Sequence, residues 1–258
     1  MKIKILTLFP EMFDGLLSNS IVKRAIAKEV VSIEIINIRD YTTDKYGRVD
    51  SAPVGGGAGL IMKCQPVLDC LKAHKNDHSH TILLSPRGNT YNQQKAHFYK
   101  DNVEELIIIC GHYEGIDERV NNYVDELISV GDYILTGGEI ASMAIADSVI
   151  RLLDGAISEE SIKEESFEQG LLEYPQYTEP YNYEGDKIPD ILYSGNHGAI
   201  EKYRKKQSLI ITRKYRPDLF RQYPLTKIDK KLLQEADDNI SPKWELDAIE
   251  KGHKFIKK

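Results

Sequence analysis

The sequence predicts an α/β protein with a parallel sheet, followed by a small α-helical domain. Up to Leu153, short segments rich in Ile, Leu and Val alternate with helix-like segments. Strands that alternate with helices are joined by crossovers, which favours parallel pairing. After Gly195 the helical patterns continue without strands. A second, helical domain is therefore expected at the carboxyl end.

Five segments are expected to be buried strands because they are short, apolar and β-branched. They cover residues 3–9, 31–38, 81–85, 105–110 and 125–130. Helices are expected at 13–28, 66–74, 92–100 and 139–153. Pro66 suits a first helical turn, where no backbone donor is needed.

From Asp154 to about Tyr193 the apolar periodicity fades, and Gly, Pro, Tyr and acidic residues become frequent. Loops of this length are uncommon in compact domains and are usually functional or disordered. We therefore expect a first domain at 1–156, a linker at 157–193 and a helical domain at 194–258. The helices expected in the last domain cover 197–213, 216–223, 227–238 and 241–256.

The charge of the chain is unevenly distributed. The 258 residues carry a net charge of −6, with 41% apolar and 29% charged residues, which indicates an ordinary globular protein. Residues 201–231 hold eleven Lys and Arg against three acidic residues, a net of +8 that leaves −14 for the remainder. Aromatic residues are interleaved with these cations, at Tyr203, Tyr215, Phe220 and Tyr223. Such a stripe is typical of RNA binding, and a solvated helix face is the alternative.

Several classes of protein are disfavoured. Three cysteines without a Cys-x-x-Cys pair argue against disulfides and structural zinc, and favour the cytoplasm. No apolar run reaches the roughly 18 residues of a membrane span, and the first apolar segment is expected to be a strand. Dinucleotide, Walker and nucleophile-elbow motifs are absent. The spacing of His74, His78 and His80 would allow a metal site, but their polar surroundings favour a loop, and no metal ligands are predicted.

Glycine-marked segments follow three of the expected strands. They are Leu83–Gly88, Cys110–Val120 and Val130–Glu139, and a fourth glycine-rich segment covers 53–60. Ligands of open α/β sheets bind at the carboxyl ends of strands. These segments could form one pocket, in which backbone amides pair with the edge of a flat heterocycle and apolar side chains cover its faces. Ordinary turns, and a mobile loop at 53–60, are the alternatives.

These motifs resemble the bacterial tRNA (guanine-N(1))-methyltransferases, from residue 1 to about 225. The matching stretches are Leu8–Phe13, Gly55–Gly57, Leu84–Pro86, Cys110–Val120, Val130–Glu139, Gly170–Leu172, Tyr174–Thr178 and Leu192–His197. The resemblance implies the SPOUT fold, an α/β domain with a deep trefoil knot. Knots are rare exceptions to the rules of chain connection, and the periodicity of this sequence does not predict one.

The resemblance also implies a binding site for S-adenosylmethionine in the knot. By motif match, its residues are Leu83, Leu84, Ser85, Pro86, Gly111, Tyr113, Glu114, Gly115, Val130, Gly131, Asp132, Tyr133, Ile134, Leu135, Gly137 and Gly138. It further implies a homodimer with shared active sites, tRNA as partner and 1-methylguanosine next to the anticodon as product. Neither DNA nor a membrane is expected as a partner, and the use of Mg²⁺ stays open.

The chemistry of the implied reaction calls for a carboxylate and a cation. Guanine N1 holds a proton at neutral pH, so a base must remove it, and negative charge then develops toward O6. The family's arginine matches Arg151, and the family's aspartate position holds Glu165. Glutamate is one methylene longer, and a misplacement of about 1 Å can cost on the order of 100-fold in rate. For Arg151 the alternative is a surface ion pair, and for Glu165 it is a solvated acidic run.

Other positions also depart from the family pattern. Ser51-Ala52 stands where the family often has acidic and Arg residues. Ala58 replaces a usual proline, and Glu179 replaces a usual arginine. Three other functions therefore stay open. They are a SPOUT enzyme acting on another base or a ribose, a catalytically idle RNA-binding homologue, and an unrelated small-molecule enzyme. The basic stripe and the missing dinucleotide motif count against the last.

Overall fold

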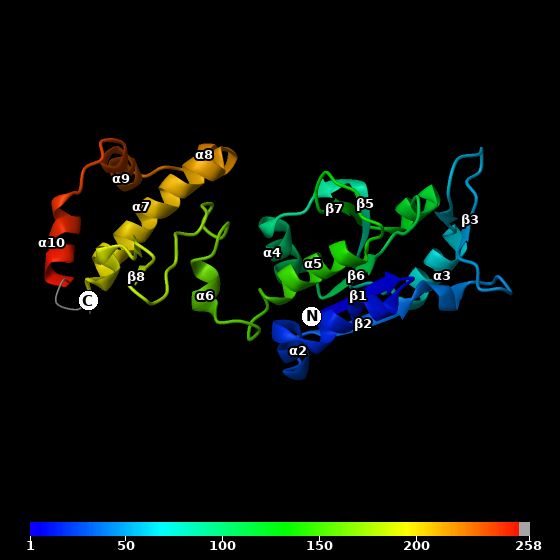
Figure 1. The fold of residues 1–258 in the computed structure, drawn as a ribbon. Coiled ribbons are helices and arrows are strands. Elements are labelled where there is room, and N and C mark those ends of the chain that lie inside the picture. Colours follow the sequence, from blue (N-terminus) through cyan, green and yellow to red (C-terminus); the bar gives the residue numbers. More distant parts are fainter. Residues whose placement is uncertain (253–258) are drawn as a thin grey trace. The chain divides into compact units, whose positions relative to one another are not determined.

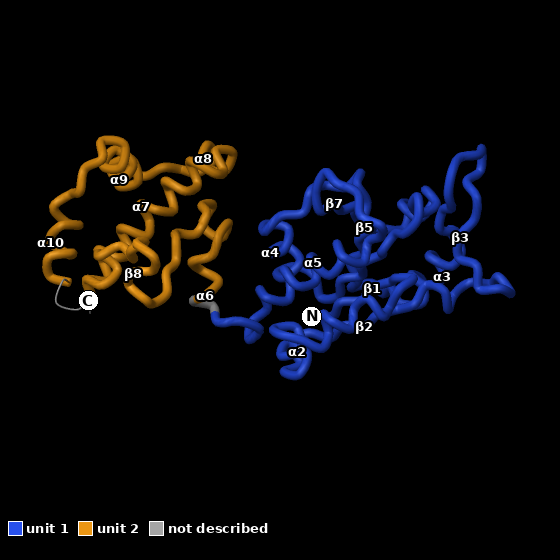
Figure 2. The backbone as a smooth tube through the Cα atoms, viewed as in Figure 1, with its two compact units in different colours: residues 1–159 blue, residues 160–258 orange. Residues whose placement is uncertain are grey.

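The structure is a computed structural model that describes residues 1–252, without the side chains of residues 159 and 160. The chain divides into two compact units, residues 1–159 and 160–258, shown in different colours in Figure 2. The last residues of the helix expected at 241–256 lie outside the described part.

The first unit is built on a five-stranded sheet in the order β2-β1-β6-β5-β7 (Figure 1). Every neighbouring pair in it is parallel. The strands are β1 (Lys2–Thr7), β2 (Ser32–Asn37), β5 (Ser79–Thr90), β6 (Glu105–Ile109) and β7 (Glu126–Ser129). The predicted parallel α/β architecture is therefore confirmed, and all five expected strands are present.

The expected helices of the first unit are also present. They are α1 (Asp14–Ser18) and α2 (Ser20–Ala27), α3 (Cys64–His74), α4 (Gln93–Asn102) and α5 (Glu139–Ile150). One helix was expected at 13–28, but Asn19 is extended and Ser20 has a φ of 53°, which separates α1 from α2. Short 3₁₀ segments complete the unit, namely η1 (Pro10–Phe13), η2 (Ile38–Tyr41) and η3 (Glu118–Tyr123).

Apolar residues of alternate strand positions form the core under α3. Val67 and Leu71 of α3 pack in one cluster with Leu6, Leu83 and Ile109. Side chains alternate between the two faces of a strand, so the neighbours of these residues face the other side of the sheet. There α5 contacts α4, α2 and β1.

Strand β5 continues beyond its expected end at residue 85. It pairs with β7 at Leu84, shifts register, and pairs again from Asn89 to Thr90. Between these points Gly88 lies against the backbone of β7, where an added Cβ atom would be 2.4 Å from the carbonyl carbon of Leu127. A larger residue does not fit there, which explains the glycine in the middle of the strand.

A small hairpin, β3 (Asp50–Ser51) and β4 (Ile61–Met62), encloses the glycine-rich segment 53–60. The sequence did not predict these two-residue strands. Met62 N–H donates to the Gly115 carbonyl at 2.9 Å, and Asp117 N–H donates to the Met62 carbonyl at 3.0 Å. The hairpin is therefore tied to the segment that follows β6.

The second unit contains the four expected helices, α7 (His197–Tyr215), α8 (Pro217–Gln222), α9 (Lys227–Asp237) and α10 (Lys243–Gly252). It also holds the hairpin of β8 (Asn182–Tyr183) and β9 (Asp186–Lys187), and η4 (Asp190–Tyr193). The short helix α6 (Glu159–Lys163) begins at the last residue of the first unit and continues into the second. Asn196 caps α7, and a reciprocal capping box of Thr226 and Asp229 begins α9.

Much of the segment expected as a linker packs against the helices of the second unit. Leu171 is only 5% exposed and lies in a core cluster with Leu209 and Leu232. The N–H of Leu172 donates to the hydroxyl of Thr212 at 2.8 Å. Single apolar anchors of this kind leave no periodic signal in a sequence. Among the described residues, no helix is long and apolar enough to cross a membrane.

Candidate functional site

One cavity of about 410 Å³ lies at the carboxyl ends of β6 and β7, beside the middle of β5 and the first turn of α5. Its walls come from residues 84–86 of β5 and from the glycine-marked segments that follow β6 and β7. The three strands are neighbours in the sheet, so segments far apart in sequence meet there. This edge is where open parallel sheets bind ligands, and the volume is typical of small-molecule sites.

All the residues predicted to bind the cofactor line this cavity, apart from Leu83 and Asp132. Those that line it are Leu84, Ser85, Pro86, Gly111, Tyr113, Glu114, Gly115, Val130, Gly131, Tyr133, Ile134, Leu135, Gly137 and Gly138. Leu83 is buried in the core under α3, on the opposite face of β5 from Leu84. Asp132 is exposed to solvent.

The lining also contains His112, which lies within the implied wall Gly111–Gly115. Four further lining residues were not named by the sequence reasoning, namely Ile128, Ser129, Thr136 and Ala141. His112 and Thr136 lie inside the glycine-marked segments, so those segments as a whole were the signal. Ala141 is on α5, and only its helical position at the cavity brings it to the wall.

The chain entering α5 passes tightly against the end of β6. Gly138 N–H donates to the Gly111 carbonyl at 2.8 Å, and His112 pairs with Gly137. A Cβ atom added at Gly138 would lie 2.8 Å from the Cα atom of Cys110. Glycine is needed at this crossing because the two backbones touch.

A buried carboxylate stands behind this crossing. Glu139 is 1% exposed, and its Oε1 accepts a hydrogen bond of 2.7 Å from the Thr7 hydroxyl of β1. Its Oε2 lies 3.7 Å from Nδ1 of His112, whose ring contacts that of Phe9 at 4.6 Å between centroids. Glu139 occupies the first turn of α5, where the helix dipole favours negative charge. It thereby joins β1, α5 and the cavity wall.

Two side chains connect the cavity to the outer loops. The Glu114 carboxylate accepts from Leu60 N–H at 2.8 Å, which holds the end of the glycine-rich segment. Partial burial raises the pKa of Tyr113, a hydrogen bond to Asp50 raises it further, and a hydrogen bond with Arg39 opposes both. The rim of the cavity is therefore tied to β3 and to the segment after β2.

Arg151 does not line the cavity. It follows the last residue of α5, is half-buried, and donates its N–H to the Asp147 carbonyl at 3.0 Å. The cavity lies at the first turn of the same helix. A helix of twelve residues is about 18 Å long, so the two ends of α5 are well separated.

Glu165 lies in the second unit, just after α6. It is half-buried, and its N–H donates to the Ile162 carbonyl at 3.1 Å. It lines a separate hollow of about 330 Å³ together with Glu164, Tyr174 and Arg204. Arg151 belongs to the first unit, so the two predicted catalytic residues lie in different units.

Polar and aromatic contacts hold the segment of Glu165 against α7. Tyr174 donates a hydrogen bond to Glu164, and the Arg204 guanidinium lies 4.5 Å from the centre of the Tyr174 ring. Burial, followed by the hydrogen bond to Glu164, raises the pKa of Tyr174 to about 12. Phe167 packs under Arg216 at 5.8 Å. The predicted base therefore sits in a turn that contacts α7.

The basic stripe of residues 201–231 forms parts of α7, α8 and α9. Some of its cations are paired within the protein, including Arg213 with Asp237 at 2.6 Å and the buried Lys206 with Glu245 at 3.5 Å. Other cations lie over aromatic rings, namely Lys202 over Trp244, Lys205 over Tyr223 and Lys214 over Tyr215. The stripe thus combines cations and rings as RNA binding requires, although part of its charge is already balanced.

The histidines considered for metal binding do not converge. His74 bonds to the Tyr41 hydroxyl at 2.7 Å, His80 bonds to Glu126 at 2.9 Å, and His78 is exposed. No group of three or more His, Cys, Asp or Glu that could hold a metal is found within the described residues.

The chain is similar to known proteins over most of its length. The family model described as tRNA (Guanine-1)-methyltransferase TrmD matches residues 1–222. A protein of Clostridium botulinum (strain Langeland) named tRNA (guanine-N(1)-)-methyltransferase is 54% identical over 242 residues, which cover 93% of this chain and 100% of that protein. A protein of the same name from Clostridium novyi (strain NT) is 54% identical over 236 residues, which cover 91% of this chain and 97% of that protein.

The matched region includes the whole first unit and extends into the helices of the second. It therefore covers the strand-end cavity, Arg151 and Glu165 together. The chain belongs to the tRNA (guanine-1)-methyltransferase family.

Proposed function

We propose that this protein transfers a methyl group from S-adenosylmethionine to N1 of a guanine in tRNA, next to the anticodon. One observation carries the proposal. The glycine-marked segments that resemble the family's cofactor motifs meet in a single cavity at the carboxyl edge of the sheet. We further propose that the tight crossing at Gly111 and Gly138 belongs to the knot implied by the resemblance.

The residues present suit S-adenosylmethionine. Glycines leave backbone amides and carbonyls open to the edge of an adenine ring, while Leu84, Ile134 and Leu135 can cover its faces. Bound there, S-adenosylmethionine supplies a methyl group on a positively charged sulfur. The protein must then position the guanine and manage its proton.

In this proposal Glu165 is the general base. Its carboxylate accepts the proton of guanine N1, which turns that nitrogen into a nucleophile. The contacts of Tyr174 with Arg204 and with Glu164 support the turn that holds Glu165.

Arg151 stabilises the negative charge that develops at guanine O6. It lies at the far end of α5 from the cavity of its own chain, so it acts on a guanine methylated at the cavity of a second copy. The proposal therefore includes a homodimer with shared active sites. The protein works in the cytoplasm, consistent with its unpaired cysteines. The described residues assign no ligands to Mg²⁺.

The test compares Glu165→Gln with wild type and with Glu168→Gln as matched control, using unmodified tRNA and radiolabelled cofactor. We expect Glu165→Gln to lose methyl transfer and to keep its affinity for S-adenosylhomocysteine in calorimetry. Unchanged turnover in Glu165→Gln would exclude this residue as the base.

A nucleoside digest of the wild-type product identifies the reaction. 1-Methylguanosine supports the proposal, while a different methylated base or a 2′-O-methylribose points to another SPOUT enzyme. No methyl transfer by wild type, with tRNA still bound, would indicate the idle RNA-binding homologue.

A further inference from the structure

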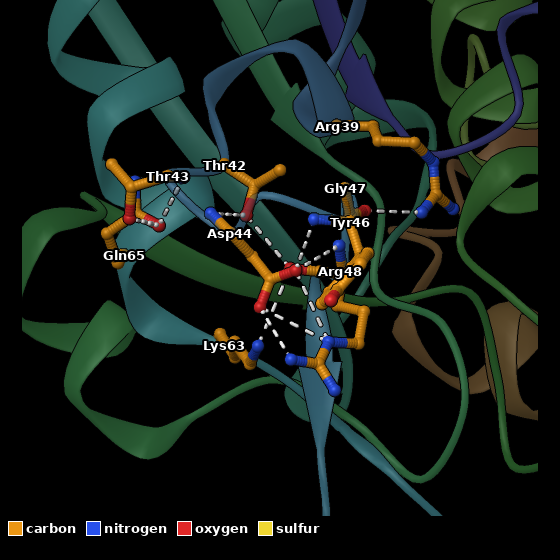
Figure 3. A network of polar contacts seen from close by, with 9 residues as sticks. All are labelled: Arg39, Thr42, Thr43, Asp44, Tyr46, Gly47, Arg48, Lys63 and Gln65. Atoms are coloured by element: carbon orange, nitrogen blue, oxygen red, sulfur yellow. Dashed lines mark hydrogen bonds and ion pairs between the residues drawn. The ribbon is translucent and has the colours of Figure 1, made fainter.

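A turn at the carboxyl end of β2 presents an exposed tyrosine on a rigid base. It covers residues 42–48 and follows η2. The Asp44 carboxylate is its centre, because Oδ1 accepts from Tyr46 N–H at 2.9 Å and both oxygens contact the Arg48 guanidinium, the shortest distance being 3.0 Å (Figure 3). These hydrogen bonds hold the pKa of Asp44 down at about 2, with Arg48 as the main cause. The carboxylate is ionised at neutral pH, and its hydrogen bonds to Tyr46 and Arg48 join the two ends of the turn.

Further contacts close the turn and join it to neighbouring parts of the first unit. The Thr42 hydroxyl donates to the Arg48 carbonyl at 2.8 Å, and Lys63 Nζ lies 3.5 Å from the same oxygen. Gln65 of α3 accepts from the Thr43 N–H and hydroxyl at 3.2 Å each. Figure 3 shows these side chains gathered around Asp44.

Tyr46 itself is not used for packing. It is 70% exposed, so its ring contributes little to the core. The Lys45 ammonium lies 4.7 Å from the centre of its ring and the Arg48 guanidinium 5.5 Å. The exposed ring offers a stacking face beside the positive charge of Lys45, while Arg48 is paired with Asp44.

The turn is also connected to the donor cavity. Arg39 donates from Nη1 to the Gly47 carbonyl at 2.9 Å, and it lies close enough to Tyr113, which lines the cavity, to lower the pKa of that side chain. Asp50 of β3 raises the pKa of the same tyrosine. Arg39 therefore contacts the turn and lies near the rim of the cavity.

We propose that Tyr46 is a stacking platform for an unpaired base of the anticodon loop, close to the guanine that is methylated. Unstacked RNA bases are bound on aromatic side chains, and neighbouring cations receive the phosphates. This inference rests on the proposed function, because it assumes that tRNA is the substrate. It adds the surface that holds a neighbouring base.

The test compares Tyr46→Ala with Tyr46→Phe and with Tyr123→Ala as matched control. Tyr123 is 46% exposed and has Lys72 5.6 Å from its ring centre, but it precedes β7 at the amino edge of the sheet, away from the cavity. Tyr46→Ala should raise the KM for tRNA by about 5- to 150-fold, as expected for one lost stacking contact, with kcat and the affinity for S-adenosylhomocysteine kept. Tyr46→Phe and Tyr123→Ala should resemble wild type.

A binding measurement without turnover separates this inference from the proposed function. Anticodon stem-loop RNAs carry 2-aminopurine at single loop positions and are titrated with protein and S-adenosylhomocysteine. The 2-aminopurine fluorescence at one loop position should be quenched by wild type and by Tyr46→Phe. It should stay unquenched when the RNA is saturated with Tyr46→Ala.

An unchanged KM and unchanged quenching in Tyr46→Ala overturn the inference, even if wild type forms 1-methylguanosine. A shift of Tyr46→Ala from dimer to monomer in sedimentation also overturns it, since Tyr46 would then face a second copy. If wild type forms no 1-methylguanosine, the proposed function fails instead.

Discussion

The position of Arg151 predicts that two inactive variants restore activity when combined in one dimer. The cavity lies at the first turn of α5, and Arg151 follows its last residue. The twelve residues of α5 span about 18 Å, which an arginine side chain cannot bridge. An active site that uses both features must therefore take them from different copies.

The two variants are Arg151→Ala, which keeps its cavity, and Leu135→Arg, which fills the cavity and places a cation against a sulfonium donor. Leu135 is half-buried, so the new guanidinium can reach water and the fold should persist. Each variant alone should be inactive. Calorimetry with S-adenosylhomocysteine should show binding to Arg151→Ala and none to Leu135→Arg.

Co-expression with two different affinity tags isolates the mixed dimer. One of its two sites pairs an intact cavity with an intact Arg151 from the other copy, so it should have about half the wild-type rate per dimer under two-fold symmetry. The assay is transfer of radiolabelled methyl to unmodified tRNA. If the mixed dimer stays as inactive as its parents, or if wild type sediments as a monomer, the assignment of Arg151 to a shared site is wrong.

Three further predictions concern the fold and its pH dependence. Gly138→Ala should lower the Tm and weaken S-adenosylhomocysteine binding in calorimetry, because the new Cβ would lie 2.8 Å from the Cα atom of Cys110; an unchanged Tm would contradict a close crossing. Thr226→Ala breaks the capping box with Asp229 and should destabilise the second unit by about 1 kcal/mol in urea unfolding, whereas Thr226→Ser should not. Burial raises the pKa of Tyr91 to about 12, so its stabilising contribution is present below about pH 10, where the unfolded tyrosine titrates, and is lost as the pH rises to 12. Tyr91→Phe should flatten the fall of Tm across that window, and an equal fall in both proteins would refute this origin.

The strands and helices were predictable because their signals are local. The apolar run before Cys110 and the glycines after it identify the end of β6, and the same pattern marks β7. Parallel pairing follows from the alternation of strands and helices. The sequence could therefore place most of the cavity wall at one edge of a sheet, and the family motifs assigned a ligand to it.

Other features depended on contacts between distant residues. The bond between Thr7 and Glu139 joins positions that are 132 residues apart, and no local pattern announces it. Leu83 was grouped with the cavity residues, but the alternation of β5 turns it into the core. The sequence also did not predict that β5 pairs with β7 again beyond Leu84, because this pairing depends on a close approach at Gly88.

By itself, the sequence determined the five strands of the main sheet, the longer helices and the chemistry carried at the strand ends, because hydrophobic period and backbone freedom are properties of short segments. Only the tertiary structure decided which side chains face the cavity, that Arg151 stands at the opposite end of α5, and that the turn of Asp44 holds Tyr46 out toward solvent. Those outcomes depend on packing and hydrogen bonds between segments, and such contacts exist only once the chain is folded.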